Sequence, residues 1–282
     1  MQNTNNLKYT LLLLVFLGFA CSEKKEINNK LSIDFEQTKE GKLSDKALKK
    51  IWPGASLICG KKDYIFYKTG ITPQSKKIVA ENENQFLQVL LPKDRFGPVT
   101  GTQWKIPLSP SDAYIFSYKI KFDEDFDFVK GGKLPGLAGG TANTGGKIPT
   151  GYDGWSARLM FWEDGQLSYY AYFPDQTMEY GERFYFMNEK GDTLQISKGN
   201  WHSVKQLVKL NTVNKKDGVL QAWFDGAEVF KSDTMVFRNT PDLKIDQVLF
   251  NVFMGGSDKS WAPKKNEFIA FDDLQVLSQK LR

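Results

Sequence analysis

The chain has 282 residues, of which 41% are hydrophobic and 25% charged, so it can bury a substantial core and is not globally disordered. Its formal net charge of +5 excludes a strongly acidic surface and permits an anionic partner without requiring one. Aromatic residues make up 14% of the chain, a composition that favours strands over helix bundles.

The first predicted element is a targeting segment. Lys8 precedes the uncharged apolar run Leu11–Ala20, which ends directly at Cys21. This run is too short for a permanent membrane-spanning helix, whereas a basic flank followed by a short apolar stretch is typical of a secretory signal. A cysteine directly after Gly-Phe-Ala resembles a bacterial lipobox. We therefore expect residues 1–20 to be a signal peptide and Cys21 to be lipidated; an ordinary signal with a chance cysteine is the alternative.

The polar stretch 21–30 is expected to tether the following domain to a membrane of the bacterial cell envelope, facing either the periplasm or the outer surface. Residues 31–282 are expected to form one domain. Removal of the signal leaves Cys59 as the only free thiol. No intramolecular disulfide can then form, so the core alone must stabilise the fold.

Residues 31–282 carry many short runs with period-two or strongly apolar patterns, separated by turn residues, and these predict strands. Ser44–Ile51 predicts the one helix, with Ser44 as its N-cap. No long sequence period repeats, which excludes solenoids and propellers. So many antiparallel strands predict an all-β jelly-roll sandwich of two antiparallel sheets with a concave, glycan-binding face. The predicted strands are Leu31–Phe35, Tyr64–Lys68, Phe86–Leu91, Ala113–Phe122, Trp155–Trp162, Leu167–Phe173, Ser203–Leu210, Val219–Phe224, Gln247–Phe253 and Glu267–Val276.

Several common chemistries lack their motif. The sequence has no Cys/His cluster for zinc and no phosphate-binding Gly-Lys-Ser/Thr loop. His202, the only histidine, lies in a strand pattern and is expected to be structural or solvent-facing. Glu124, Asp125 and Asp127 lie near a turn without the arrangement of a glycosidase acid pair, so we expect them to form a solvated loop. We expect no nucleic-acid partner and no metal at the functional site.

The stretch Phe128–Gly140 is rich in glycine and contains Lys130 and Lys133. Glycine lets a backbone turn sharply or approach a ligand closely. The stretch therefore predicts a turn-rich loop that places positive charge beside a ligand. A second glycine-rich loop, Thr141–Asp153, leads into the strand that begins at Trp155.

The turn after that strand determines which side chains share a face. A two-residue turn at 164–165 would place Arg158 opposite Ala171. A three-residue loop at 163–165, with its glycine in the left-handed region, places Arg158 opposite Tyr170 instead. The hydrophobic pattern favours the three-residue loop.

In this register one face of the hairpin is polar and cationic, with Ser156 and Arg158 beside Tyr170 and Tyr172. The opposite face is apolar and is expected to lie in the core. Its residues are Trp155, Ala157, Leu159, Phe161, Tyr169, Ala171 and Phe173.

A face of this kind fits the removal of the C5 proton of a uronic acid in a polysaccharide. Arg or Lys can neutralise the carboxylate, because their positive charge stabilises the carbanion-like intermediate. A tyrosine with a lowered pKa can act as base and acid. A non-catalytic carbohydrate-binding face uses the same residue types, and the residues alone also leave open that the face has no function.

Three segments resemble polysaccharide lyase family 14, a family of alginate lyases and related uronate lyases with a β-jelly-roll fold. They are Gly131–Gly136, Gly154–Phe161 and Tyr170–Tyr172. The resemblance extends to Trp201–Val204, Asp225–Gly226 and Asn251–Gly256, and it spans Phe86–Val276. Some members carry a histidine shortly before the Ser-x-Arg strand. Residues 148–153 contain none, so a role for that histidine is not transferred.

The resemblance implies a catalytic set of Lys133, Arg158, Tyr170 and Tyr172. Ser156 matches the serine of the family's Ser-x-Arg strand and is expected to bind substrate. Further expected substrate-binding residues are Arg95, Gln103 and Lys130. Asn251 is not expected to be catalytic.

We therefore expect a monomeric polysaccharide lyase that cleaves a uronate polymer, alginate first, by β-elimination and without a required cofactor. A structural calcium ion bound by carboxylates away from the site is compatible with this expectation. The alternative is a jelly-roll lectin for acidic glycans. The sequence leaves open the identity of the uronate, endo or exo cleavage, and which tyrosine is acid or base.

Overall fold

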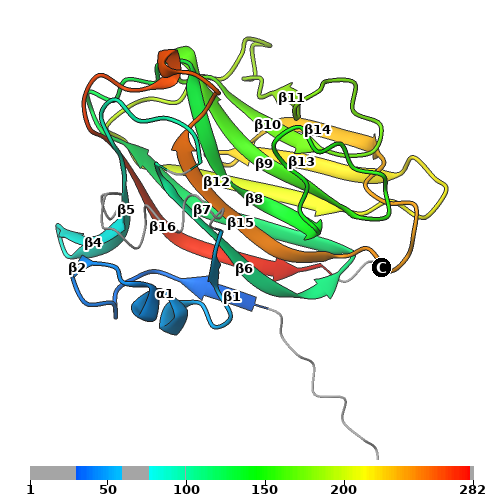
Figure 1. Cartoon of the computed structure of the whole chain (residues 1–282), viewed down its shortest axis with the longest axis horizontal. Helices are drawn as coiled ribbons and strands as arrows, with labels where there is room; N and C mark the ends of the chain where they lie inside the picture. The colour runs from blue at the N-terminus through cyan, green and yellow to red at the C-terminus, as the bar shows by residue number, and fades with distance from the viewer. Residues whose placement is uncertain (1–29, 59–75, 99, 280–282) are drawn as a thin grey trace, which may run out of the picture.

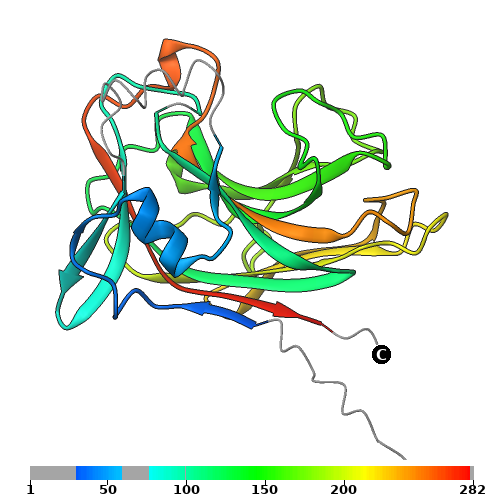
Figure 2. The ribbon, with the colours of Figure 1, turned by 60° about the horizontal axis from the view of Figure 1, so that its bottom comes forward.

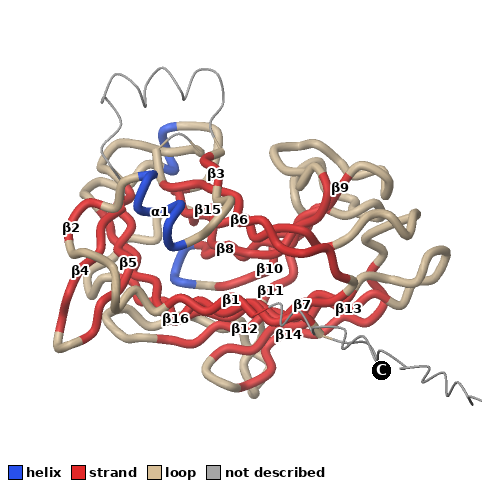
Figure 3. Tube along the Cα trace, turned by 90° about the horizontal axis from the view of Figure 1, so that it is seen from below, coloured by secondary structure: helices blue, strands red, loops and turns tan. Residues whose placement is uncertain are grey.

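The computed structural model describes residues 30–58, 76–98 and 100–279. The predicted signal peptide, Cys21, most of the tether and the predicted strand Tyr64–Lys68 lie outside the described residues. The described chain forms two antiparallel sheets packed face to face (Figures 1 and 3). The prediction of an all-β jelly-roll sandwich is confirmed.

One sheet has nine strands, and β1 (Lys30–Ile33) pairs with its strand β16. The order of the other eight is β14 (Ala227–Met235), β13 (Gly218–Phe224), β12 (His202–Lys209), β7 (Ala113–Phe122), β16 (Glu267–Ser278), β5 (Asn84–Leu91), β4 (Lys76–Glu81) and β2 (Gly41–Lys42).

The second sheet has seven strands and carries the hairpin singled out by the sequence. Its order is β11 (Glu182–Tyr185), β10 (Leu167–Tyr172), β9 (Gly154–Trp162), β8 (Gly131–Gly140), β15 (Ile245–Met254), β6 (Thr102–Ser111) and β3 (Ser56–Leu57). We call the side of this sheet that is turned away from the nine-stranded sheet its outer face.

The described helical segments are short. Helix α1 (Asp45–Ile51) begins as predicted, with the Ser44 hydroxyl accepting a hydrogen bond from the Ala47 amide at 3.2 Å. Two 3₁₀ turns, η1 (Glu163–Gly165) and η2 (Lys259–Trp261), complete the set. No helix in the described part of the chain is long and apolar enough to cross a membrane.

The core lies between the two sheets and is rich in aromatic residues. Trp104 stacks on Phe250 with ring centroids 4.2 Å apart, and Trp52 packs against both rings. All seven residues predicted for the inner face of the β9–β10 hairpin, Trp155 to Phe173, belong to this core. Their burial fixes the register of the hairpin, because a one-residue slip would turn this apolar set outward.

The prediction of a turn-rich loop in the glycine-rich stretch is wrong for residues 131–140. These residues form β8, a buried strand between β9 and β15. The glycines permit close strand packing: a Cβ atom at Gly136 would collide with the backbone of Ala157 and Arg158, and one at Gly132 would collide with Phe161. Glycine in this strand thus permits close backbone approach, which sequence composition does not distinguish from a turn.

Loops from both ends of the seven-stranded sheet rise on its outer side. In Figure 2 the η2 turn (orange) and the green loops near β9 stand at opposite ends of the molecule. Trp261 of η2 packs against the cluster of Met160, Trp162, Tyr170 and Tyr172. The outer face is therefore flanked by loops on both sides of this cluster.

Candidate active site

The β9–β10 hairpin has the three-residue register predicted from the sequence. Arg158 lies opposite Tyr170, and Ser156 lies opposite Tyr172. The connecting turn η1 contains two residues in the left-handed region, Asp164 (φ 59°) and Gly165 (φ 75°). All four predicted hairpin residues therefore lie on the outer face.

Lys133 joins this group from the neighbouring strand β8, where it pairs with Met160. Its side chain is 8% exposed. The ammonium lies 3.3 Å from the centroid of the Tyr170 ring and donates to Met160 Sδ at 2.7 Å. Burial, followed by the positive charges of Arg158 and Arg183, holds the pKa of Lys133 well below its usual value. Deprotonation of this amine is therefore unusually easy.

A β-bulge at Pro135 sets the position of Lys133. The register of β8 against β9 jumps from Leu134 opposite Leu159 to Gly136 opposite Arg158, which leaves Pro135 as the extra residue. The Pro135 carbonyl points across the core and accepts hydrogen bonds from Gln206 Nε2 at 3.0 Å and from the Tyr118 hydroxyl at 3.4 Å. Two strands of the opposite sheet thus support the bulge.

Arg158 is a buried cation without a carboxylate partner among the described residues. Its Nη1 donates to Asn251 Oδ1 at a long 3.4 Å, and its Nε has no hydrogen-bond partner. Burial lowers the pKa of Arg158, yet arginine remains protonated in proteins. The site therefore contains an uncompensated positive charge that is available to an anion.

The two tyrosines pack edge to face, with ring centroids 5.8 Å apart. Gly181 covers both rings so closely that a Cβ atom there would collide with them. The Tyr172 hydroxyl accepts a hydrogen bond from the Gly146 amide at 3.1 Å. Burial, and then the neighbouring Tyr172, raise the pKa of Tyr170 despite the opposing effect of Arg158. Tyr170 is therefore a protonated phenol at neutral pH.

Ser156 is completely buried, and its hydroxyl donates to the Asn143 carbonyl at 2.6 Å. This bond attaches the loop after β8 to the hairpin, beside the contact that Gly146 makes with Tyr172. Ser156 therefore lies beside the predicted catalytic residues, and its hydroxyl holds the loop after β8 in place.

The other predicted substrate-binding residues are spread over the surroundings. Gln103 on β6 is connected to the site, because its Oε1 accepts from Asn251 Nδ2 at 3.0 Å. Arg95 is exposed in the turn after β5. Lys130 is exposed before β8 and donates to the Ser260 hydroxyl at 2.8 Å. The structure brings Gln103 into contact with the group and leaves Arg95 and Lys130 at the periphery.

Three residues of the site are not predicted by the sequence. Asn251, for which no catalytic role is expected, lies between Arg158 and Gln103 and hydrogen-bonds to both. Met160 contacts the Lys133 ammonium. Arg183 lies on β11, opposite Tyr170. Alternation along Glu-Arg-Phe-Tyr could have placed Arg183 on a polar face, but only strand pairing identifies that face as the one with Tyr170.

His202 lies on the other sheet, away from this group. Its Nδ1 is 2.7 Å from Asp225 Oδ2, and its Nε2 is 2.7 Å from the Ser197 hydroxyl. These bonds join the loop before β12 to the turn after β13, in line with the expected structural role.

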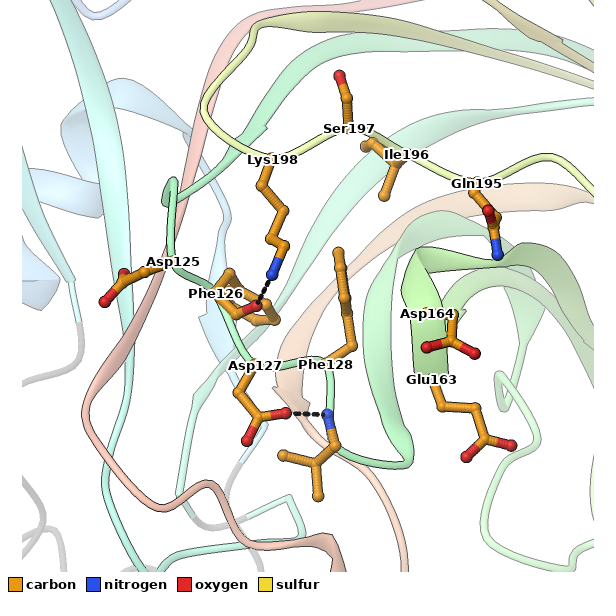
Figure 4. A pocket seen from close by; sticks show the side chains of 11 residues that line it. Asp125, Phe126, Asp127, Phe128, Glu163, Asp164, Gln195, Ile196, Ser197 and Lys198 are labelled. Carbon is orange, nitrogen blue, oxygen red and sulfur yellow. Dashed lines mark hydrogen bonds between the residues drawn. The ribbon is translucent and has the colours of Figure 1, made fainter.

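The predicted acidic loop borders a cavity of about 890 Å³. Figure 4 shows Lys198 donating to the Phe126 carbonyl and Asp127 accepting from the amide of Val129, at 2.8 and 2.9 Å. Asp125 is exposed and pairs with Lys265 at 3.1 Å. None of the predicted catalytic residues lines this cavity. Within the described ranges, no three His, Cys, Asp or Glu residues are grouped so that they could hold a metal ion.

A family model described as Polysaccharide lyase 14 matches residues 79–274. The alginate lyase Aly36B superposes with a TM-score of 0.77 at 24% identity, covering 91% of this chain and 99% of Aly36B. The marine PL-14 alginate lyase from Aplysia kurodai gives a TM-score of 0.63 at 24% identity, covering 81% of this chain and 99% of that enzyme.

The alginate lyase vAL-1 from Chlorella virus gives a TM-score of 0.61 at 19% identity, covering 79% of this chain and all of vAL-1. At such identities these structures establish a shared fold. Exolysin of Paramecium bursaria Chlorella virus 1 is 23% identical over 205 residues, which are 62% of this chain. The match covers 31% of Exolysin, so the chain spans about a third of that relative's length.

Proposed function

This chain belongs to the polysaccharide lyase 14 family, and on that basis we propose that it cleaves a uronic-acid polysaccharide, alginate first, by β-elimination. The family supports a lyase that acts on a polysaccharide. Alginate is favoured because the structural neighbours Aly36B, the Aplysia kurodai enzyme and vAL-1 are described as alginate lyases. Variants of Aly36B have been solved with an alginate trisaccharide and an alginate tetrasaccharide.

The observation that carries the proposal is the buried Arg158 guanidinium, which has no carboxylate partner among the described residues and lies beside the buried amine of Lys133. A buried charge without a partner is strongly unfavourable, so such a site favours the binding of a ligand of opposite charge. The carboxylate of a uronate residue supplies that charge, and the planar guanidinium of Arg158 can bind it through two hydrogen bonds. Neutralising the carboxylate also makes the C5 proton easier to remove.

The directions of the pKa shifts support a division of the proton transfers between Lys133 and Tyr170. In β-elimination a base removes the C5 proton, the bond from C4 to the glycosidic oxygen breaks, and an acid protonates that oxygen as the C4–C5 double bond forms. The lowered pKa of Lys133 makes a neutral amine available as the base. The raised pKa of Tyr170 retains its proton for the leaving oxygen.

This assignment differs from the expectation that a tyrosine with a lowered pKa acts as both base and acid. Burial raises the pKa of Tyr170, so its phenolate is disfavoured. The Lys133 ammonium lies over the Tyr170 ring. The two proposed proton carriers are therefore direct neighbours on the outer face.

The test is to incubate the soluble domain with alginate, polymannuronate, polyguluronate and polyglucuronate, and to follow the ultraviolet absorbance of unsaturated uronate ends. Tyr170→Phe keeps the ring and removes only the hydroxyl. It should lower kcat by about 10²-fold or more, with oligosaccharide binding nearly unchanged. Tyr172→Phe tests the second phenol, and Tyr152→Phe, which alters an exposed loop tyrosine, is the matched control.

Full lyase activity in both Tyr170→Phe and Tyr172→Phe would contradict this mechanism. If the wild-type protein bound uronate chains yet never produced unsaturated ends, the glycan-binding alternative would replace the lyase.

We propose in addition that the reaction needs no divalent cation, because the Arg158 guanidinium provides the positive charge that a metal ion would otherwise supply. Activity should therefore persist after EDTA treatment and gel filtration. Loss of activity with an unchanged circular-dichroism spectrum, restored by calcium or zinc, would contradict this proposal. A calcium ion that stabilises a distant loop would instead change the melting temperature.

A further inference from the structure

Edge strand β11 presents a second cationic and aromatic group on the outer face. Arg183 pairs with Tyr170, and Tyr185 pairs with Ser168. On its other side Tyr170 pairs with Arg158. Directly opposed residues of antiparallel strands point to the same side of a sheet. Arg183 and Tyr185 therefore lie on the face that carries the catalytic candidates, one strand beyond Tyr170.

Arg183 and Tyr185 are arranged around the indole ring of Trp162. The Arg183 guanidinium lies 4.3 Å from the indole centroid, and the Tyr185 ring centroid lies 6.1 Å from it. The indole itself is fixed, because it is 7% exposed and its Nε1 donates to the Ser168 hydroxyl at 2.8 Å. Stacking on a fixed ring limits the conformations of the arginine before any ligand binds.

The charge of Arg183 is available to a ligand. The side chain is exposed and forms no ion pair with a carboxylate in the described ranges. Its field reaches the catalytic group, since it contributes, after burial and Arg158, to the lowered pKa of Lys133. Arg158 and Arg183 thus place two positive charges on the outer face, one on each side of Tyr170, which suits a ligand with repeated negative charges.

Most of the exposed large apolar side chains belong to the segment of the chain that contains β9, β10 and β11. Seven large hydrophobic side chains are exposed in the described part of the chain, and all but Leu277 lie between residues 148 and 187. The six are Ile148, Tyr152, Met178, Tyr180, Tyr185 and Met187.

We propose that Arg183 and Tyr185 form a subsite for a uronate residue located beyond the cleaved bond; this inference rests on the proposed function. The backbones of neighbouring strands are about 5 Å apart, so the backbone of Arg183 lies about 10 Å from that of Arg158, with Tyr170 between them. A disaccharide spans such a distance. Arg183 binds the carboxylate of the distal sugar, and the Tyr185 ring packs against its apolar face. The subsite makes the enzyme favour long chains over the shortest oligosaccharides.

The experiment measures kcat/KM on oligouronates of increasing length, and on polymer, for the wild type, Arg183→Gln and Tyr185→Ala. Lys190→Gln, which removes an exposed positive charge just after β11, is the matched control. In the wild type kcat/KM should rise with chain length. Both subsite variants should lose about tenfold or more of kcat/KM on long chains, mainly through KM, and should change far less on the shortest cleavable oligomer. Lys190→Gln should retain the wild-type length dependence.

Two outcomes separate this inference from the proposed function. If the wild type forms unsaturated ends and both subsite variants keep its length dependence, the subsite is absent while the lyase stands. A lower melting temperature in Arg183→Gln, with unchanged length dependence, would likewise show that the arginine only shields Trp162. If the wild type forms no unsaturated ends, the proposed function fails, and calorimetric binding of oligouronates to the same three variants still tests the subsite.

Discussion

Lys133 and Arg158 occupy positions that apolar residues would fill at lower free energy. Both are buried beside aromatic rings, and no carboxylate among the described residues compensates their charge. Removing a cation from water costs on the order of several kcal/mol even after the protein relaxes. We therefore propose that these two residues serve function rather than stability.

Substitution of Lys133 by Met should stabilise the fold while abolishing catalysis. The pKa of Lys133 is lower in the folded than in the unfolded state, so the unfolded chain binds more protons, and stability rises with pH until the usual lysine pKa of about 10.4. Lys133→Met removes this dependence. Its melting temperature at pH 7 should exceed that of the wild type, and the difference should shrink as pH rises. Thermal unfolding at several pH values checks this, and a variant less stable than the wild type at pH 7 would refute it.

The pH dependence of kcat/KM should follow the same two groups. Activity should rise as Lys133 loses its proton, at a pH well below the usual lysine range because its pKa is lowered. It should fall only at strongly alkaline pH, because the pKa of Tyr170 is raised. The residual kcat/KM of Tyr170→Phe should still rise with pH as Lys133 loses its proton, but it should no longer fall at strongly alkaline pH. An acidic optimum with a fall through neutral pH would exclude Lys133 as the base.

At the scale of elements, strand β8 and its bulge determine how the site is assembled. The glycines of β8 permit close packing against β9 and β15, and the extra residue Pro135 offsets the register between Lys133 and Arg158. Proline suits this position, because a bulge residue need not donate a ladder hydrogen bond. Gln206 and Tyr118 hold the Pro135 carbonyl from the opposite sheet.

Gln206→Leu should therefore impair catalysis from across the core. The change removes the 3.0 Å bond to Pro135 and also a buried Oε1 that has no hydrogen-bond partner. The two effects on stability oppose each other, so the free energy of unfolding should change by less than about 2 kcal/mol. A displaced Lys133 should lower kcat by about tenfold or more. Steady-state kinetics and thermal melting measure both quantities.

The matched control is Gln88→Leu, which changes a half-buried glutamine on the outer side of the nine-stranded sheet. It should leave kcat unchanged. Wild-type kcat in Gln206→Leu would show that the bulge is held without this side chain.

At the scale of the whole molecule, the site exists only because segments far apart in the sequence meet on one face. Gln103 on β6 and Asn251 on β15 extend the network of Arg158. The loop containing Gly146 contacts Tyr172 from one side, while Trp261 packs against the same cluster from the other. These contacts place the catalytic candidates between loops rather than on an open sheet.

The attachment of the whole protein to a membrane stays a prediction, since Cys21 lies outside the described residues. We propose that Cys21 is lipidated, because the apolar run ends directly before it. Cys21→Ser should move the protein from the membrane fraction to the soluble fraction or stall it as an unprocessed precursor. Cys59→Ser, at the other cysteine, should not. Fractionation and intact-mass measurement decide this, and an unchanged membrane location of Cys21→Ser would contradict lipidation.

The sequence by itself determined the fold class and the hairpin at the centre of the site. Alternation in β9 and β10 is strict, and one face is apolar throughout. Only one register buries that face, so the pairs Arg158–Tyr170 and Ser156–Tyr172 followed without tertiary information. The N-cap of α1 and most of the longer strands were likewise predicted, because local patterns specify them.

Tertiary structure alone decided which strands lie beside that hairpin. Glycine-rich β8 has no apolar alternation of its own, so its pairing with β9 and β15 follows from close backbone packing. Arg183 and Asn251 became part of the site through long-range strand pairing, which a local pattern does not encode. The pKa shifts of Lys133 and Tyr170 likewise depend on burial and on charges from other strands. These are properties of the assembled sheet, because desolvation and proximity arise only when distant segments pack together.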